Sequence, residues 1–142
     1  MDEIAEFYRR WFANRQDPDY RGAEGESEEL VNGLLGVQEL NKTDFWMHHA
    51  VKLFRATILH LSCKAHSDGK DEMGRFDVMA FFGKIPIEPR WKELVESRAG
   101  DERVRLLGAD AGEFMLNSPR EVAGSVLGRI LSFFVSPDHQ VY

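Results

Sequence analysis

The 142-residue chain contains one cysteine, five prolines and no apolar run approaching the roughly 20 residues that cross a bilayer. A single cysteine excludes an intramolecular disulfide and is typical of proteins from a reducing compartment. The chain starts with Asp2, Glu3 and Glu6, unlike the basic start of a secretory signal peptide. We therefore expect a cytoplasmic domain that makes no membrane contact itself.

The sequence also lacks the glycine-rich motifs that hold phosphate groups. Neither G-x-x-x-x-G-K-[ST] nor G-x-G-x-x-G is present. Ser125 falls within an expected helix, whereas the serine of a nucleophile elbow lies between a strand and a helix. We therefore predict no enzymatic activity, no catalytic residue and no cofactor for this chain.

Metal ligation has little support in the sequence. His60, Cys63 and His66 follow one another at three-residue steps, but on one helix the first and last side chains diverge by about 120°. A tetrahedral zinc site would also need a fourth ligand, and there is no second cysteine. We predict no metal site, while a small enzyme built around a polar cleft at His60 or Cys63 remains a separate hypothesis.

The charge of the chain is uneven. The net charge is −6, and residues 1–44, with 11 acidic and 5 basic side chains, contain all of this excess. Because neutralisation of phosphates dominates nucleic-acid affinity, this balance indicates weak or no nucleic-acid binding and favours a protein partner. Modest acidity that only aids solubility is the alternative interpretation.

Apolar residues recur at helical spacing along most of the chain, and a strand-like alternation is almost absent. With 43% apolar and 11% aromatic residues, the chain can form a core. The pattern predicts a single all-α domain over residues 1–142, a compact bundle of about seven helices around a long central helix. The third expected helix runs for about 20 residues after Thr43. The other six cover about residues 2–15, 27–40, 76–83, 89–100, 104–107 and 118–137.

Several boundaries have recognisable signals. Ser27 is expected to cap the second helix, with Glu28 and Glu29 in its first turn. Gly108 is expected to end a short helix before a separate apolar segment at 114–116. Ser118-Pro119-Arg120-Glu121 has the pattern of a capping box for the last helix.

The third and last expected helices should touch in one core. This prediction rests on their apolar faces at three- and four-residue spacing. The expected core residues are Phe45, Trp46, Leu53, Phe54, Ile58, Val126, Ile130 and Phe133.

Three segments resemble a known family in their order and spacing. Asp44-Phe45-Trp46 opens a helix that ends in Ile58-Leu59-His60-Leu61, Phe76-Asp77-Val78 begins a short helix, and Ser118 to Pro137 forms a closing helix. This arrangement resembles the all-α domain of type IV secretion coupling proteins, the TraG/TraD-type conjugation ATPases. The resemblance covers residues 44–137 well and residues 1–43 poorly, and the phosphate-binding loops and membrane anchor of that family are absent.

The resemblance implies a substrate-recognition module that binds relaxase or effector proteins, possibly with accessory processing factors, for delivery to the secretion channel. Any ATPase activity would belong to a larger parent protein at the bacterial inner membrane. The isolated domain is expected to be a monomer, within a parent that can form a hexamer. The alternative is a helical domain of the conjugation machinery that contacts DNA.

Six residues are the candidate partner-binding set. The acidic group comprises Glu24, Glu26, Glu28 and Glu29, in or beside a glycine-containing loop, where we expect an electrostatic landing surface for basic segments of the partner. Trp11 and Trp91, on shorter amphipathic segments, are the expected partly exposed apolar anchors. The alternative is that these glutamates only solvate a loop and favour the start of a helix.

Overall fold

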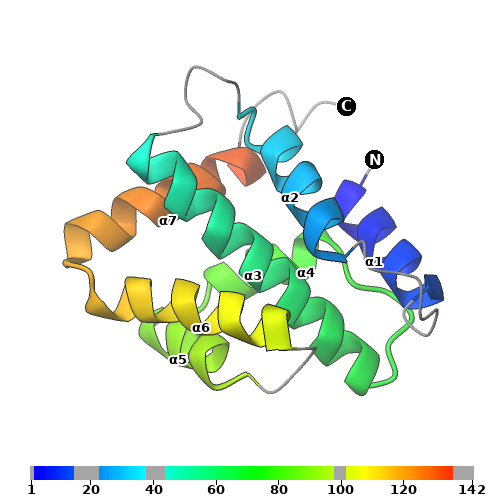
Figure 1. The fold of residues 1–142 in the computed structure, drawn as a ribbon. Coiled ribbons are helices and arrows are strands. Elements are labelled where there is room, and N and C mark those ends of the chain that lie inside the picture. Colours follow the sequence, from blue (N-terminus) through cyan, green and yellow to red (C-terminus); the bar gives the residue numbers. More distant parts are fainter. Residues whose placement is uncertain (1, 15–22, 38–43, 98–101, 136–142) are drawn as a thin grey trace.

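The computed structural model describes residues 2–14, 23–37, 44–97 and 102–135, and all regular structure in these ranges is helical. The helices are α1 (Glu3–Asn14), α2 (Ala23–Leu34), α3 (Phe45–Ser67), α4 (Arg75–Phe82), α5 (Glu88–Glu96), α6 (Glu102–Asn117) and α7 (Arg120–Val135). Figure 1 shows them packed around α3. The prediction of an all-α fold is confirmed. None of the described helices combines the length and apolar character needed to cross a membrane.

Helix α3 has 23 residues and contacts each of the six other described helices. It begins where the Asp44 side chain accepts a hydrogen bond from the Met47 amide at 3.0 Å, a standard N-cap. The expected cap, Thr43, lies outside the described residues. The helix continues to Ser67 because no glycine or proline interrupts it, and Gly69, at φ 73°, turns the chain after it.

Helices α3 and α7 share the core, as predicted. Six of the eight expected core side chains are buried: Leu53, Phe54, Ile58, Val126, Ile130 and Phe133. Trp46 is partly buried and packs against this core. The prediction for Phe45 is wrong, since its side chain is 50% exposed. Phe45 is the first residue of α3, and its ring contacts Trp46, His49 and Phe114 at the edge of the molecule instead.

Helix α6 is continuous from Glu102 to Asn117, so the expected break at Gly108 is wrong. Gly108 and Gly112 are buried on the side of α6 that faces α5. A Cβ atom on Gly108 would lie 3.1 Å from the Leu94 carbonyl oxygen. Contact between the two backbones therefore offsets the low helix propensity of glycine.

The start of α2 also differs from the prediction. The helix begins at Ala23, and Ser27 lies buried inside it, where its hydroxyl is 3.4 Å from Nε of Arg55. Ser27 is therefore a buried contact residue and not an N-cap. The helix ends at Leu34, earlier than expected, because Gly36 at φ 66° and the Val37 amide bonded to the Asn32 carbonyl form a glycine C-cap.

The link between α6 and α7 is tight. The Ser118 hydroxyl donates a hydrogen bond to the Phe114 carbonyl at 2.6 Å, and α7 begins two residues later, at Arg120. Ser118 therefore satisfies a carbonyl at the end of α6, a role that the predicted capping box did not include.

Candidate functional site

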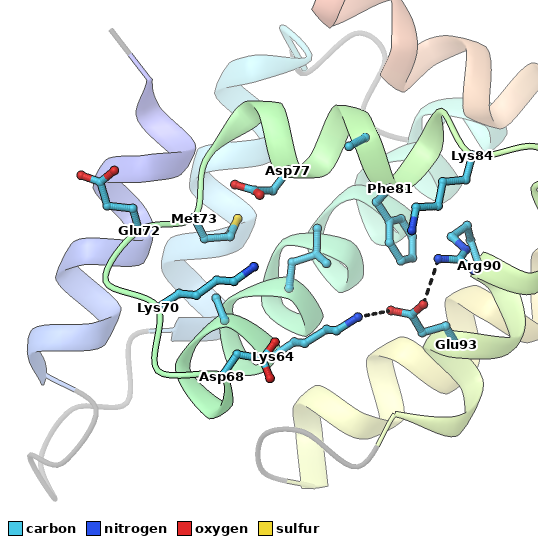
Figure 2. Close-up of a pocket in the computed structure, with 13 residues that line it drawn as sticks. Lys64, Asp68, Lys70, Glu72, Met73, Asp77, Phe81, Lys84, Arg90 and Glu93 are labelled. Carbon is cyan, nitrogen blue, oxygen red and sulfur yellow. Dashed lines mark ion pairs between the residues drawn. The ribbon is translucent and has the colours of Figure 1, made fainter.

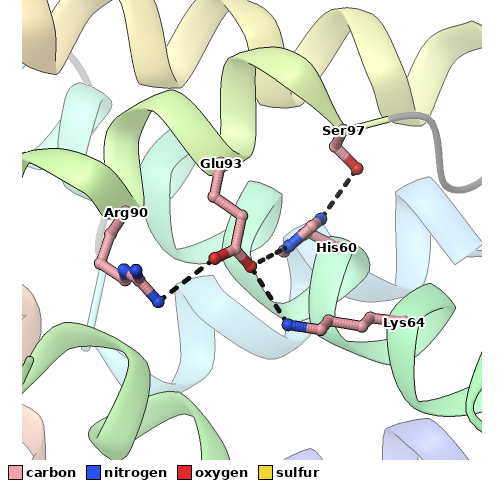
Figure 3. A network of polar contacts seen from close by, with 5 residues as sticks. All are labelled: His60, Lys64, Arg90, Glu93 and Ser97. Carbon is pink, nitrogen blue, oxygen red and sulfur yellow. Dashed lines mark hydrogen bonds and ion pairs between the residues drawn. The ribbon is translucent and has the colours of Figure 1, made fainter.

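A buried histidine joins α3 to α5. His60 on α3 is 7% exposed, and its Nε2 lies 2.7 Å from Oε2 of Glu93, while its Nδ1 lies 2.8 Å from Oγ of Ser97 (Figure 3). Glu93 and Ser97 are four residues apart, so α5 presents both to the same side. Each ring nitrogen of His60 thus has a polar partner, as a buried imidazole requires.

The Glu93 carboxylate is the centre of this network. It also lies 3.6 Å from Nζ of Lys64 and 3.2 Å from Nη1 of Arg90. Burial alone would raise the pKa of Glu93, but the hydrogen bond from His60 and the positive charges of His60, Lys64 and Arg90 hold this pKa below its ordinary value. Because an ionised carboxylate can only accept, the network assigns the proton to Nε2 of His60 and, in the neutral ring, leaves Nδ1 to accept from the Ser97 hydroxyl.

Ser97, His60 and Glu93 are connected in the same order as the serine, histidine and carboxylate of a hydrolase triad. This arrangement is relevant to the hypothesis of a small enzyme. Such chemistry also needs N–H donors that converge on an oxyanion beside the serine. Ser97 lies at the C-terminal end of α5, where carbonyl groups are presented, and its own amide is directed to the Leu94 carbonyl at 3.4 Å. We therefore interpret the network as a tie between helices.

A cavity of about 230 Å³ opens beside Glu93, bordered by α3, α4, α5 and the segment that connects α3 to α4 (Figure 2). Its wall carries equal numbers of basic and acidic side chains and several apolar ones. The basic residues are Lys64, Lys70, Lys84 and Arg90, and the acidic ones are Asp68, Glu72, Asp77 and Glu93. We call this space the basic cavity after its four cations, which are balanced by as many carboxylates.

The basic side chains are unequally paired. Lys64 and Arg90 share the single carboxylate of Glu93, while Lys70 and Lys84 form no ion pair with any described residue. Nε of Arg90 is buried and has no hydrogen-bond acceptor among the described residues. By contrast, the Asp77 carboxylate accepts from the Gly74 amide at 2.9 Å at the start of α4. Like Lys70 and Lys84, Asp68 and Glu72 form no ion pair with any described residue. The unpaired side chains of the wall therefore include both signs of charge.

Helix α4 also exposes apolar side chains that do not line this cavity. Phe76 is 72% exposed and Met79 40%, and Ile85, just beyond the helix, is 95% exposed. We call these three residues the α4 ridge. The opposite face of the helix, with Val78, Phe81 and Phe82, is buried in the core. Helix α4 is therefore apolar on two faces, of which only one is covered.

The predicted acidic residues lie on α2, and two of them form internal ion pairs. Glu26 lies 3.9 Å from Arg10 on α1, and Glu28 lies 3.9 Å from Arg55 on α3. Glu29 is exposed, and the side chain of Glu24 lies outside the described part of the structure. Part of the acidic charge expected to attract a partner is thus used to hold α2 against its neighbours.

The two tryptophans differ in exposure. Trp11 is partly buried, as expected, with its ring 5.9 Å from Tyr8 and 5.7 Å from His66 between centroids. Trp91 is only 3% exposed, so the expectation of partial exposure is wrong. Helix α5 packs between α6 and the core, which places Trp91 against Phe82 at a centroid distance of 6.2 Å. Trp91 is therefore a core residue and cannot anchor a partner in this conformation.

The histidines and cysteine of α3 are directed to different neighbours. His60 bonds to α5, His66 contacts Trp11 and Phe12 of α1, and Cys63 is buried. Within the described ranges, no group of three His, Cys, Asp or Glu side chains is arranged to hold a metal ion.

Comparison of the whole chain with protein-family models, curated proteins and solved structures gave no match.

Proposed function

We propose that this domain is a protein-recognition module that binds relaxase or effector proteins for type IV secretion, the role implied by the resemblance of residues 44–137 to coupling proteins. The observation that supports protein recognition is the α4 ridge. An exposed apolar patch on a folded domain often marks a surface that a partner covers. Each large side chain that a partner buries here would contribute about 1.5–3 kcal/mol.

The sequence neighbours of the α4 ridge carry charges of both signs. Lys84 directly precedes Ile85, and Phe76 stands between Arg75, whose guanidinium lies over the Phe133 ring, and the exposed Asp77. An apolar centre with a charged rim is the usual anatomy of a binding hot spot, in which the apolar anchors supply affinity and the rim charges affect the association rate.

Contact with DNA is the alternative function, and it would need a continuous basic surface that neutralises several phosphates. The four cations of the basic cavity lie among as many carboxylates and surround a hollow instead of forming a stripe. This mixed charge supports a protein partner over a nucleic acid.

The test is a binding titration of the purified domain with purified relaxase and effector proteins from the same cell. We expect the double variant Phe76→Ser, Met79→Ser to weaken binding at least tenfold, because it removes two exposed anchors without touching the core. The matched control is Leu106→Ser on α6, which removes an apolar side chain that is 62% exposed elsewhere on the surface. Circular dichroism and thermal unfolding would establish that each variant is folded.

The acidic surface is tested in the same assay by the triple variant Glu24→Lys, Glu26→Lys, Glu28→Lys. If α2 receives the partner, this variant loses affinity, the wild-type complex weakens as salt rises, and the α4 ridge variant binds normally. Binding that survives in both variants would place the interface on another face. If the wild-type domain binds no relaxase or effector protein, the proposed function is wrong.

A further inference from the structure

We propose that Asp2 is a positioning residue for the α4 ridge. Its carboxylate caps the N-terminal ends of α1 and α4 together, and so fixes the direction in which α4 presents Phe76 and Met79. The inference rests on the proposed function, because it concerns how the same ridge is held for a partner. It adds α1, which contributes no residue to the ridge, to the parts of the chain on which partner binding depends.

The two caps share one carboxylate. Oδ1 of Asp2 accepts a hydrogen bond from the Ala5 amide at 3.0 Å, in the first turn of α1. The other oxygen, Oδ2, accepts from the amide of Arg75, the first residue of α4, also at 3.0 Å, although Asp2 and Arg75 are 73 positions apart. An ionised carboxylate has lone pairs for both donors, and negative charge is favourable at the N-terminal end of a helix. One side chain thus stabilises two helix ends.

The cap of α4 comes from outside the helix, because the N-cap residue is Gly74, which has no side chain to accept a hydrogen bond. Asparagine, aspartate and serine are the preferred caps. The backbone of Gly74 is extended, at φ −151°, a conformation that other residues also adopt. A Cβ atom on Gly74, however, would lie 2.5 Å from Oδ2 of Asp2 and 3.3 Å from Cβ of Ala5. Glycine therefore leaves the space that the Asp2 carboxylate occupies.

Helix α1 also holds the segment that leads into α4. The hydroxyl of the buried Tyr8 donates a hydrogen bond to the Lys70 carbonyl at 2.6 Å, and Figure 2 shows the chain running from Lys70 past Glu72 to α4. At the start of α4, the guanidinium of Arg75 lies 5.0 Å from the centre of the Phe133 ring on α7. The first residue of α4 is thus fixed through its amide by α1 and through its side chain by α7.

These supports matter because α4 is short. It has eight residues, whereas an isolated helix of fewer than about 12–15 residues is marginal in water. Phe76 is its second residue, so fraying of the first turn would redirect this side chain before any other part of the ridge. Asp2 therefore acts on the binding surface through the backbone of Arg75, without contact with the partner.

The first experiment measures hydrogen exchange of the Arg75 amide in the domain without a partner. Asp2→Leu keeps a branched side chain but removes both acceptors, so this amide should exchange about fivefold faster. Gly74→Ala should have the same effect, because the added methyl group displaces Oδ2 while Oδ1 can still serve α1. The matched control is Asp44→Leu, which removes the N-cap of α3 alone and should change exchange at Arg75 by less than about twofold, since exchange there reports local opening.

The second experiment repeats the titration with relaxase and effector proteins for the same three variants. We expect Asp2→Leu and Gly74→Ala to weaken binding by about threefold or more, and Asp44→Leu to bind like the wild type. Adding Asp2→Leu to the ridge variant Phe76→Ser, Met79→Ser should cause no further loss, because a residue that acts only through the ridge is not additive with it. Circular dichroism and thermal unfolding would establish that each variant is folded.

The outcomes separate this inference from the proposed function. If the wild type binds no relaxase or effector protein, the proposed function is wrong, and the role of Asp2 in binding is overturned with it. If the wild type binds and the folded Asp2→Leu variant binds equally well, only the inference is overturned. Unchanged exchange at Arg75 in the Asp2→Leu variant, or a further loss of affinity when Asp2→Leu is added to the ridge variant, would also overturn it.

Discussion

Gly112 lies directly against the backbone of Trp91, so that a Cβ atom on Gly112 would come within 2.6 Å of the Trp91 carbonyl oxygen. The same atom would lie 2.7 Å from a methyl group of Val95. A backbone oxygen cannot move aside as the end of a flexible side chain can. The contact between α5 and α6 therefore requires glycine at this position.

Gly112→Ala should destabilise the domain by about 1–3 kcal/mol, because the added methyl group forces α6 away from α5. The free energy of unfolding by denaturant measures this loss. Gly124→Ala on α7 is the matched control, since nothing lies within 4 Å of its Cβ position and alanine is the better helix former. A gain of up to about 1 kcal/mol is expected there. Equal effects of the two substitutions would contradict this packing.

Ile58→Ala should cost about 2–5 kcal/mol, because Ile58 is fully buried on α3 and its loss leaves a cavity. Denaturant unfolding again provides the measurement. Leu106→Ala, at a site that is 62% exposed, should change stability by no more than about 0.5 kcal/mol. A loss below 1 kcal/mol at Ile58 would mean that the core around α3 is not packed as described.

Glu93→Gln should lower stability at neutral pH by about 1.5–3 kcal/mol, because it removes the charged acceptor from His60, Lys64 and Arg90. The pKa of Glu93 in the folded protein lies below its ordinary value of 4.5. The stability that Glu93 contributes is therefore complete above pH 4.5 and is lost as the pH falls through the lowered pKa. Unfolding curves from pH 7 to pH 3 should show the wild type and the variant converging toward acid. A difference that stays constant over this range would show that the Glu93 charge is not responsible.

His49→Phe should remove a loss of stability that the wild type shows in mild acid. The His49 ring stacks on Phe114 at 3.7 Å between centroids, and burial, His48 and Lys52 lower its pKa, against the opposing effect of Asp110. The unfolded chain binds a proton near pH 6.5 that the folded protein resists, so stability falls as the pH decreases from 6.5 toward the lowered pKa. Phenylalanine keeps an aromatic ring on Phe114 and cannot take up the proton. Thermal unfolding at pH 7.5 and 5.5 tests this, and an equal decrease in both proteins would contradict it.

Helical periodicity in the sequence was sufficient to predict the class of fold and most of the core. It succeeded for α3 and α7 because their apolar residues recur over many turns, as at Ile58 and Val126. It failed at the start of α2 and within α6. By local preference serine favours an N-cap and glycine favours the end of a helix, so Ser27 and Gly108 were expected at helix boundaries. Tertiary contacts with Arg55 and Leu94 reverse these preferences in the folded protein.

The candidate site was harder to predict, because its residues come from separate segments. His60 is 33 residues from Glu93, and no local spacing indicates that the two meet. The i, i+3 pair of Arg90 and Glu93 and the i, i+4 pair of Glu93 and Ser97 were the available signals, since they mark one polar face on α5. The exposure of Phe76 had no signal, because periodicity cannot distinguish an apolar face that is covered from one that is left open.

The close approach of α5 and α6 has a consequence for the dynamics of the domain. Glycine at positions 108 and 112 makes α6 a poor helix in isolation, and α5, with nine residues, is too short to be stable alone. Each helix therefore persists only while the other is in place, and we expect the pair to open and close as one cooperative unit. In native-state hydrogen exchange, the protected amides of α5 and α6 should share a single opening free energy, separate from that of α3.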